Sequence, residues 1–372
     1  MPTDTSDRDV REFFRVVAED MPLSGAEQPA AVRLAKRRLL RNAALTAVGL
    51  CLAAVAVVSS VLALENSSGE RRIPAELSTV QSTAPPSTQA PSTPPARTDS
   101  VGAGVIAYAN DGIYTINSDG SNPQKVLDCA NCSSPVWSPD GREIAYVQAP
   151  GVLEGGLYVW GLAGDHSMVV RCHPPTCEAR DVAWSPDGRL LAYTNSGPHG
   201  TGIDVVDVDG SNPRRISPAG LEAEMPAWSP DGTQIAFAHV GTTGDRIYVM
   251  NADGSGLTKI LDRPGGSGPG APSWSPDGKK IAYFNTPRTD RGFVGQVRVM
   301  SPDGTDDSLL YQSKCCVEDW RGPAWSPDGT AIAFVIETDP LQPPELMVMD
   351  ADGSNVTAVT EAWERPSWRP NP

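Results

Sequence analysis

A pentapeptide, Trp-Ser-Pro-Asp-Gly, recurs along much of the chain and restricts its fold more than any other feature. Five full copies begin at Trp137, Trp184, Trp228, Trp274 and Trp325. A degenerate copy, Trp368-Arg369-Pro370, follows at the same phase, and successive copies are 47, 44, 46, 51 and 43 residues apart. A period in this range indicates repeated structural units that bury a core only by stacking on their neighbours.

Each unit contains signals for four short strands, which are clearest in the unit that starts at Trp228. A first strand leads into Trp228, and the others cover residues 235–237, 247–250 and 258–261. Asp-Gly pairs separate the first strand from the second and the third from the fourth. Such pairs favour tight hairpins, because glycine accepts the positive φ that the turn requires. Four-stranded units of about 45 residues are typical of propeller blades.

The second strands give the number of blades. They share an Ile/Leu-Ala-Tyr/Phe pattern and cover residues 106–108, 144–146, 191–193, 235–237, 281–283 and 332–334. The first copy has no tryptophan strand before it, and Trp368 has no second strand after it. These two fragments complement each other. The sequence therefore predicts an all-β, six-bladed β-propeller over residues 103–372, in which the C-terminal strand closes the first blade and leaves no open edge.

The repeats resemble those of TolB-type propellers, relatives of the WD-repeat family. The resemblance rests on the pentapeptide, its spacing and the number of units, and it covers about residues 103–370. It implies a propeller fold and, as one alternative, a role as a cell-envelope assembly or translocation scaffold. TolB proteins are soluble and carry a separate α/β domain before the propeller. This chain departs from that pattern, because an apolar segment and a stalk occupy the corresponding place.

Three segments precede the propeller. Residues 43–64 contain 22 residues without a charge, enough for one helix across a hydrocarbon core of about 30 Å. A cleaved signal peptide would start nearer the N-terminus, and a buried globular helix would not need the cations that lie just before it: Arg33, Lys36, Arg37, Arg38 and Arg41. The positive-inside rule then makes residues 1–42 cytoplasmic. We expect a single-pass protein of the cell membrane with an extracytoplasmic propeller.

The flanking segments differ in composition. In residues 1–42, Val10, Phe13, Phe14 and Val17 would share one face of a short amphipathic helix. This arm is either a frayed tail or a docking helix for a cytoplasmic partner. Residues 65–102 are rich in Pro, Ser and Thr and predict a semi-rigid stalk.

Six of the seven cysteines form close pairs in loops that connect neighbouring blades. The pairs are Cys129 with Cys132, Cys172 with Cys177, and Cys315 with Cys316, while Cys51 lies in the apolar segment. Outside the cytoplasm such pairs favour local disulfides. Zinc binding and redox chemistry are the alternatives. The adjacent pair, Cys315 and Cys316, requires a strained bond, so its oxidation state stays open.

The loops divide between two faces of the predicted propeller. Strand direction alternates, so the short Asp-Gly turns lie on one face. The longer, varied loops lie on the other, including those at 147–156, 194–202 and 284–295 between second and third strands. Varied loops on a rigid scaffold commonly carry binding residues. Candidate binding residues in these loops are His173, His199, His239, Arg288, Asp290, Arg291 and Trp320. The Asp-x-Asp-Gly stretches at 207–210 and 350–353 resemble the start of a calcium loop but lack its other ligands, so we interpret them as turns.

The absence of several sequence features narrows the set of possible functions. The net charge of −15 argues against nucleic-acid binding, which requires a basic surface. No Gly-x-Ser-x-Gly elbow or phosphate-binding loop occurs. We therefore expect no enzyme, cofactor or metal, and a binding or sensing module for a protein, peptide or glycan of the cell envelope. A propeller lyase or glycosidase is the less favoured alternative.

Overall fold

The computed structural model describes residues 104–370, with gaps at 130, 150–154, 173–176, 240–244, 264–267, 269, 291, 314–319 and 338–341. The predicted arm (1–42), membrane helix (43–64) and stalk (65–102) lie outside the described residues, as does Cys51. Within the described part of the chain, no helix is long and apolar enough to span a membrane.

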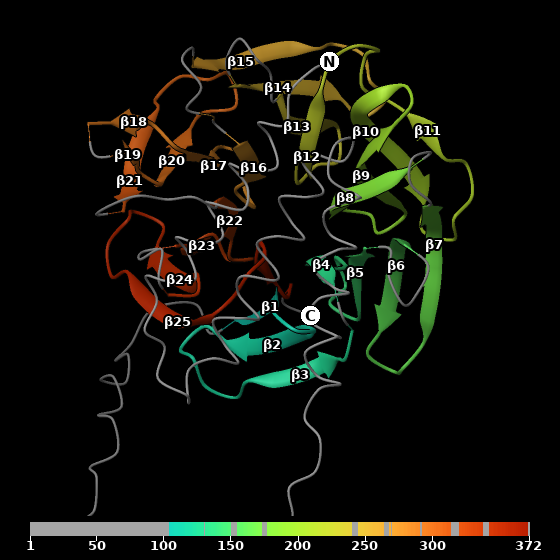
Figure 1. The fold of residues 1–372 in the computed structure, drawn as a ribbon. Helices are drawn as coiled ribbons and strands as arrows, with labels where there is room; N and C mark the ends of the chain where they lie inside the picture. The colour runs from blue at the N-terminus through green and yellow to red at the C-terminus, as the bar shows by residue number, and fades with distance from the viewer. Residues whose placement is uncertain are drawn as a thin grey trace, which may run out of the picture. The chain divides into compact units, whose positions relative to one another are not determined.

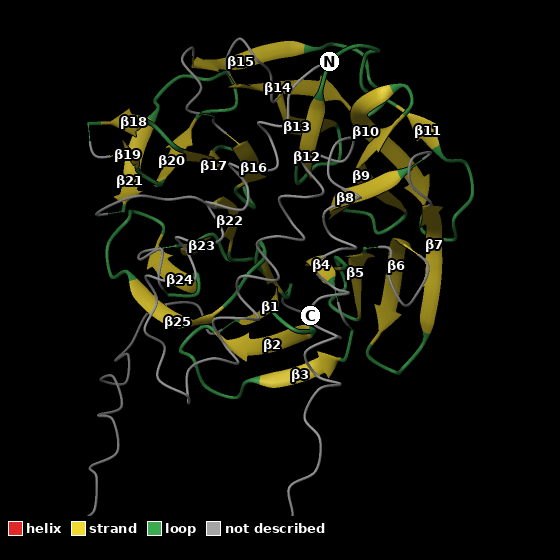
Figure 2. Cartoon of the chain, in the orientation of Figure 1, coloured by secondary structure: helices red, strands yellow, loops and turns green. Residues whose placement is uncertain are grey.

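Six antiparallel four-stranded sheets form a ring, each sheet being one blade (Figures 1 and 2). Blade 2 is β4 (Cys132–Trp137), β5 (Glu143–Gln148), β6 (Gly155–Gly161) and β7 (His166–Cys172). Blade 3 is β8 (Glu178–Trp184), β9 (Leu190–Gly197), β10 (Gly200–Asp207) and β11 (Arg214–Arg215). Blade 4 is β12 (Ala223–Trp228), β13 (Gln234–His239), β14 (Asp245–Asn251) and β15 (Thr258–Arg263). The strands that were predicted from the Trp228 unit are confirmed.

The remaining blades follow the same plan with one addition. Blade 5 is β16 (Gly270–Trp274), β17 (Ile281–Asn285), β20 (Gln296–Met300) and β21 (Ser308–Gln312), with a separate hairpin of β18 (Arg288–Thr289) and β19 (Gly292–Phe293). Blade 6 is β22 (Trp320–Trp325), β23 (Ala331–Ile336), β24 (Glu345–Asp350) and β25 (Thr357–Glu361). Blade 1 is β26 (Ser367–Trp368), β1 (Val105–Ala109), β2 (Ile113–Asn117) and β3 (Gln124–Leu127).

The two ends of the propeller meet in blade 1, as the sequence predicts. Strand β26 pairs antiparallel with β1, so that Trp368 lies opposite Ile106 and Ser367 opposite Ala107. The red C-terminal end of the ribbon lies beside the teal β1 in Figure 1. Arg369 extends the contact to the next blade, because its Nε donates to the Gly141 carbonyl at 2.9 Å. Its guanidinium also lies 5.0 Å from the Trp137 ring centre.

The core lies between blades rather than within them. Ala331, Ala333 and Val335 of blade 6 pack in one cluster with Ile106 and Trp368 of blade 1. Similar clusters join the other neighbouring blades, and the second strands supply most of their fully buried side chains. Each large apolar side chain buried in this way contributes about 1.5–3 kcal/mol. A blade therefore depends on both neighbours for its stability.

The pentapeptide is a turn whose side chains satisfy its own backbone. In the first copy, Ser138 Oγ donates to Asp140 Oδ1 at 2.7 Å and accepts from the Glu143 amide at 2.9 Å. Asp140 Oδ1 also accepts from the Arg142 amide at 3.1 Å. Gly141 adopts φ of 66°, a region that glycine enters without steric cost. The same bonds recur at Asp187, Asp231, Asp277 and Asp328.

The repeated turns predict sensitivity to acid. The serine hydroxyl and backbone amide that donate to each turn aspartate lower the pKa of its carboxyl group. A lowered folded-state pKa stabilises the fold above the ordinary aspartate value and loses that stabilisation as the pH falls through the folded pKa. We expect the melting temperature to decrease between pH 5 and pH 2, followed by circular dichroism. A melting temperature that stays constant over this range would contradict the coupling.

Candidate functional site

The antiparallel order places two kinds of connection on opposite faces of the ring. The Trp-Ser-Pro-Asp-Gly turns and the turns between third and fourth strands share one face, here the turn face. Connections between second and third strands and between blades share the other, here the loop face. The Asp-x-Asp-Gly stretches at 207–210 and 350–353 are turns on the turn face, where Asp207 and Asp350 accept bonds from Asn212 and Asn355. No metal-binding cluster of His, Cys, Asp and Glu occurs among the described residues.

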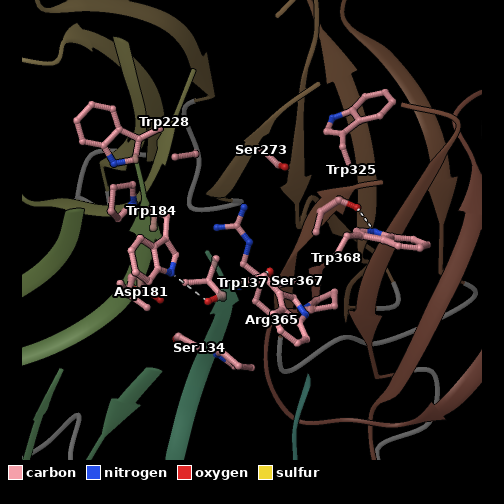
Figure 3. Close-up of a pocket in the computed structure, with 18 of the residues that line it drawn as sticks. Ser134, Trp137, Asp181, Trp184, Trp228, Ser273, Trp325, Arg365, Ser367 and Trp368 are labelled. Atoms are coloured by element: carbon pink, nitrogen blue, oxygen red, sulfur yellow. Dashed lines mark hydrogen bonds between the residues drawn. The ribbon is translucent and has the colours of Figure 1, made fainter. Parts of the chain in front are cut away.

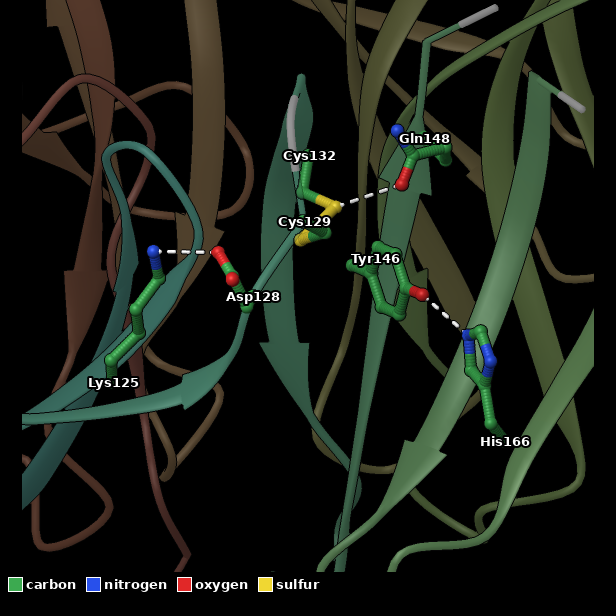
Figure 4. Close-up of a disulfide and its surroundings, with 7 residues drawn as sticks. All are labelled: Lys125, Asp128, Cys129, Cys132, Tyr146, Gln148 and His166. Atoms are coloured by element: carbon green, nitrogen blue, oxygen red, sulfur yellow. Dashed lines mark hydrogen bonds and ion pairs between the residues drawn. A yellow bond between two sulfur atoms is a disulfide. The ribbon is translucent and has the colours of Figure 1, made fainter. Parts of the chain in front are cut away.

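Two of the predicted disulfides are present and lie on either side of blade 2. Cys129 is joined to Cys132 and Cys172 to Cys177. Cys132 Sγ lies 3.1 Å from Gln148 Oε1 (Figure 4). Both bridges fix the chain where it enters or leaves a blade, on the loop face. Cys315 and Cys316 lie outside the described residues.

The described candidate binding residues lie on different strands and hairpins of blades 3 to 6. His199 is exposed in the turn between β9 and β10, whereas His239 ends β13, with Nδ1 2.9 Å from the Glu222 carbonyl oxygen. Arg288 and Asp290 are exposed on the β18–β19 hairpin. Trp320 begins β22, opposite Ile336. His173 and Arg291 lie outside the described residues.

Blade 3 differs from the long loop that the sequence indicates at 194–202. Strands β9 and β10 pair as far as Gly197 and Gly200, so only two residues form the turn. Arg215 stabilises this extension from β11: its Nη2 donates to the Asn195 carbonyl at 3.0 Å, and it forms an ion pair with Asp204. The result is a long hairpin with His199 at its tip.

A small pocket of about 160 Å³ lies between blades 2 and 3 on the loop face. Gly155 and Gly156 leave one wall without side chains, and the Cys172–Cys177 disulfide forms part of another. Arg180 lines the pocket and donates to Ser196 Oγ at 2.7 Å, while its Nε has no acceptor among the described residues. Burial raises the pKa of Glu224, and Arg180, 3.6 Å away, partly offsets that rise.

The innermost strands of blades 2 to 6 carry a bulge just before the tryptophan, and Arg365 has the corresponding position in blade 1. In blade 3, residues 181 and 182 together oppose residue 193. Such bulges turn a side chain out of the strand pattern. The first bulged residue always lies three positions before the tryptophan, and four of the six have φ near +50°: Ser134, Asp181, Met225 and Ala271. The equivalent residues of blades 6 and 1 are Gly322 and Arg365.

Arg365 lies at the centre of the ring of six blades. A cavity of about 260 Å³ runs along the axis, and Figure 3 shows the Arg365 guanidinium standing in it. Its Nη2 donates to the carbonyls of Pro272 at 2.8 Å and Pro323 at 3.3 Å. The Arg365 side chain is half-buried, because the cavity leaves part of it open. Burial lowers the pKa of Arg365 to about 10, against the opposing effect of Asp181, so the group stays cationic at neutral pH.

Two ion pairs lie around the axis. Their residues come one position before the residues, such as Asp181 and Arg365, that lie three positions before a tryptophan. Arg180 of blade 3 faces Glu224 of blade 4 at 3.6 Å, and Arg321 of blade 6 faces Glu364 of blade 1 at 3.5 Å. All four residues lie four positions before a repeat tryptophan. Blades 2 and 5 carry Ser133 and Gly270 there. The charges therefore follow an approximate two-fold symmetry around a six-fold framework.

The tryptophans connect the innermost strands to one another. Nε1 of Trp184 donates to the carbonyl of Val136 at 3.2 Å, and the equivalent bonds join Trp274 to Ala227 and Trp368 to Ala324. The indole N–H groups of Trp137, Trp228 and Trp325 have no acceptor among the described residues. Around the ring, tryptophans whose indole N–H bonds to a neighbouring inner strand thus alternate with tryptophans whose indole N–H does not.

Comparison with known proteins agrees with this geometry. The family model described as TolB beta propeller domain matches residues 106–371. The chain belongs to the TolB β-propeller family. No curated protein matches the sequence. This TolB-type propeller is similar in fold to TolB from Acinetobacter baumannii, with 22% identity and a TM-score of 0.60 over 72% of this chain and 67% of that one.

Other solved structures share the fold. A putative TolB from Agrobacterium tumefaciens is 25% identical, with a TM-score of 0.57 over 72% of this chain and 93% of that one. A chain of a nidogen/laminin complex is 12% identical, with a TM-score of 0.54 over 72% and 98% of the two chains. This likeness shows a common architecture and carries no information on ligands.

Sequence reasoning missed the charged residues of the axis. Neither Arg365 nor Asp181 belongs to a recognised motif, and both lie in stretches that were assigned to strand or loop. An alignment of the six repeats on their tryptophans would have found them, because the third position before each tryptophan is otherwise small or apolar: Ser134, Met225, Ala271 and Gly322.

Proposed function

We propose that this TolB-type propeller is a membrane-anchored, extracytoplasmic module that binds a protein, peptide or glycan through its loop face. The observation that carries the proposal is the difference between the two faces. Turns on the turn face repeat the same hydrogen bonds from blade to blade, whereas the loop face carries two disulfides and two dissimilar hairpins. Diverse loops on a rigid scaffold are where binding commonly occurs.

The β18–β19 hairpin is the most distinctive element of this face. Its exposed residues include a cation, Arg288, an anion, Asp290, and an aromatic ring, Phe293, which is 41% exposed. Arginine and aromatic side chains are enriched among residues that dominate binding energy at protein interfaces. At the base of the hairpin, the Val294 amide donates to the Pro287 carbonyl at 3.1 Å. A protein or peptide partner fits these residues best.

Binding rather than catalysis is supported by the state of the turn carboxylates. The aspartates of the pentapeptide turns accept hydrogen bonds from their own turns and have lowered pKa values. A general acid needs the opposite shift. These turn aspartates therefore offer no general acid, and Glu224, whose pKa burial raises, is ion-paired with Arg180. We propose a non-enzymatic role, without a cofactor.

The test is a pull-down from cell-envelope extract with the full-length oxidised protein in detergent. In the variant, residues 286–295 are replaced by the short blade 1 turn, Asn110 to Gly112. The control carries Lys279→Gln on the turn face, where Lys279 is exposed. A partner that the wild type and the control retain and the variant loses would support the proposal. Equal recovery by all three proteins would refute binding through the hairpin.

A further inference from the structure

The axial cavity contains two opposite charges that do not neutralise each other directly. Arg365 and Asp181 both line it. No carboxylate of the described residues lies within the 4.0 Å ion-pair distance of Arg365, whose bonds go to two neutral carbonyls. A buried charge without an ionic partner is costly in a folded protein. Its presence in an open cavity indicates a site that a charged ligand completes.

The guanidinium is positioned rather than free. Two prolyl carbonyls, from blades 5 and 6, accept from its Nη2 and fix its plane. Blade 6 has glycine at the bulge position, and a Cβ on Gly322 would lie 2.1 Å from the Ala271 Cβ. Gly322 and Ala271 therefore let blades 5 and 6 approach each other closely at this position. Nε and Nη1 have no acceptor among the described residues, so the guanidinium keeps N–H groups for a planar carboxylate.

Asp181 is positioned by different means. Its Oδ2 accepts from Thr194 Oγ1 at 3.2 Å, and no described residue donates to Oδ1. Its φ of 50° is a conformation that costs energy for most residues and that the bulge imposes. Arg180, the neighbouring cation, pairs with Glu224 instead. The Asp181 carboxylate is therefore available to a cation in the cavity.

We propose that the axial cavity binds a free α-amino acid, whose carboxylate contacts Arg365 and whose ammonium group contacts Asp181. A simple anion would be repelled by Asp181 and a simple cation by Arg365, whereas a zwitterion matches both charges. The volume of about 260 Å³ lies just below the usual range for drug-sized ligands and suits a smaller ligand such as an amino acid. The remaining wall is neutral, formed by prolines, serines and indole rings. This site is separate from the loop-face hairpin.

Isothermal titration calorimetry of the full-length protein in detergent at pH 7 tests the proposal. The probes are glycine, L-alanine and L-leucine, and the comparators are acetate and ethylammonium, which each carry half of the recognised group. We expect at least one amino acid to bind at least tenfold more tightly than either comparator. Binding of none of the three, or binding of acetate as tight as that of the best amino acid, would overturn the proposal.

Variants then assign the site. Arg365→Gln and Asp181→Asn should each weaken amino-acid binding at least tenfold, while Lys279→Gln, which removes an exposed cation on the turn face, should leave it unchanged. Asn keeps the shape of Asp and tolerates positive φ, so Asp181→Asn decides the question if Arg365→Gln does not fold. Wild-type affinity in Asp181→Asn would overturn the proposal.

Discussion

Deletion of residues 367–372 is expected to abolish the cooperative unfolding transition of the propeller. The deletion removes β26, and with it the pairing of Trp368 with Ile106 and the indole bond to the Ala324 carbonyl at 3.0 Å. It also removes Arg369, which bonds to Gly141. Blade 1 would then contact blades 2 and 6 through an incomplete inner edge, and an exposed edge strand invites aggregation.

A single substitution in β26 should also lower the stability of the propeller, but by less than the deletion does. Trp368 is 5% exposed and packs in the cluster between blades 6 and 1. Trp368→Ala is expected to lower the free energy of unfolding by about 3–5 kcal/mol, the usual cost of removing a large buried aromatic side chain. Urea denaturation followed by tryptophan fluorescence measures it. Deletion of residues 371 and 372 alone is the control. If the protein that lacks residues 367–372 kept the wild-type free energy of unfolding, closure of the ring by β26 would be disproved.

The second large effect is expected from Gly304→Ala. Gly304 forms the turn between β20 and β21 with φ of 86°, and a Cβ there would lie 2.0 Å from the Ile260 carbonyl oxygen of blade 4. The positive φ alone costs an alanine about 1–2 kcal/mol. The collision with backbone adds about 1–3 kcal/mol, because a packed interior yields poorly. We expect a total loss of about 2–5 kcal/mol.

The ring supplies a matched control for this substitution. Gly164, in the equivalent turn of blade 2, has φ of 96° and no atom within 4 Å of its would-be Cβ. Gly164→Ala should therefore cost only the conformational share, about 1–2 kcal/mol. Urea melts of the two variants separate the contributions. Equal destabilisation would show that blades 4 and 5 do not depend on this close approach.

The sequence predicts the framework well because each blade is specified locally. The pentapeptide satisfies its own backbone groups, so its recurrence marks the turn wherever it occurs. The continuously apolar second strands supply most of the buried side chains, and the unmatched fragments at Val105 and Trp368 predict closure. The family match and the six sheets confirm these predictions. The membrane span, the arm and the stalk stay predictions.

The site is harder to predict because it depends on where different blades meet. A loop expected at 194–202 is mostly strand, since Arg215 on another strand supports the extension. Arg365 of blade 1 bonds to the carbonyls of Pro272 in blade 5 and Pro323 in blade 6, and no local pattern reveals these contacts between blades. His199 and Arg288 were identified as exposed loop residues, and the structure places them on different hairpins.

The bulge near the axis has a consequence for how such a protein changes its ligand. Of the six residues that lie three positions before a tryptophan, Ser134, Asp181 and Arg365 line the cavity, and none of the six takes part in the turn that defines the repeat. The residues that would contact a ligand and the residues that form the turn therefore occupy separate positions of the same repeat. Substitutions at this position would change the charge and polarity of the axial cavity in a related propeller. The turns and strands of each blade would stay the same.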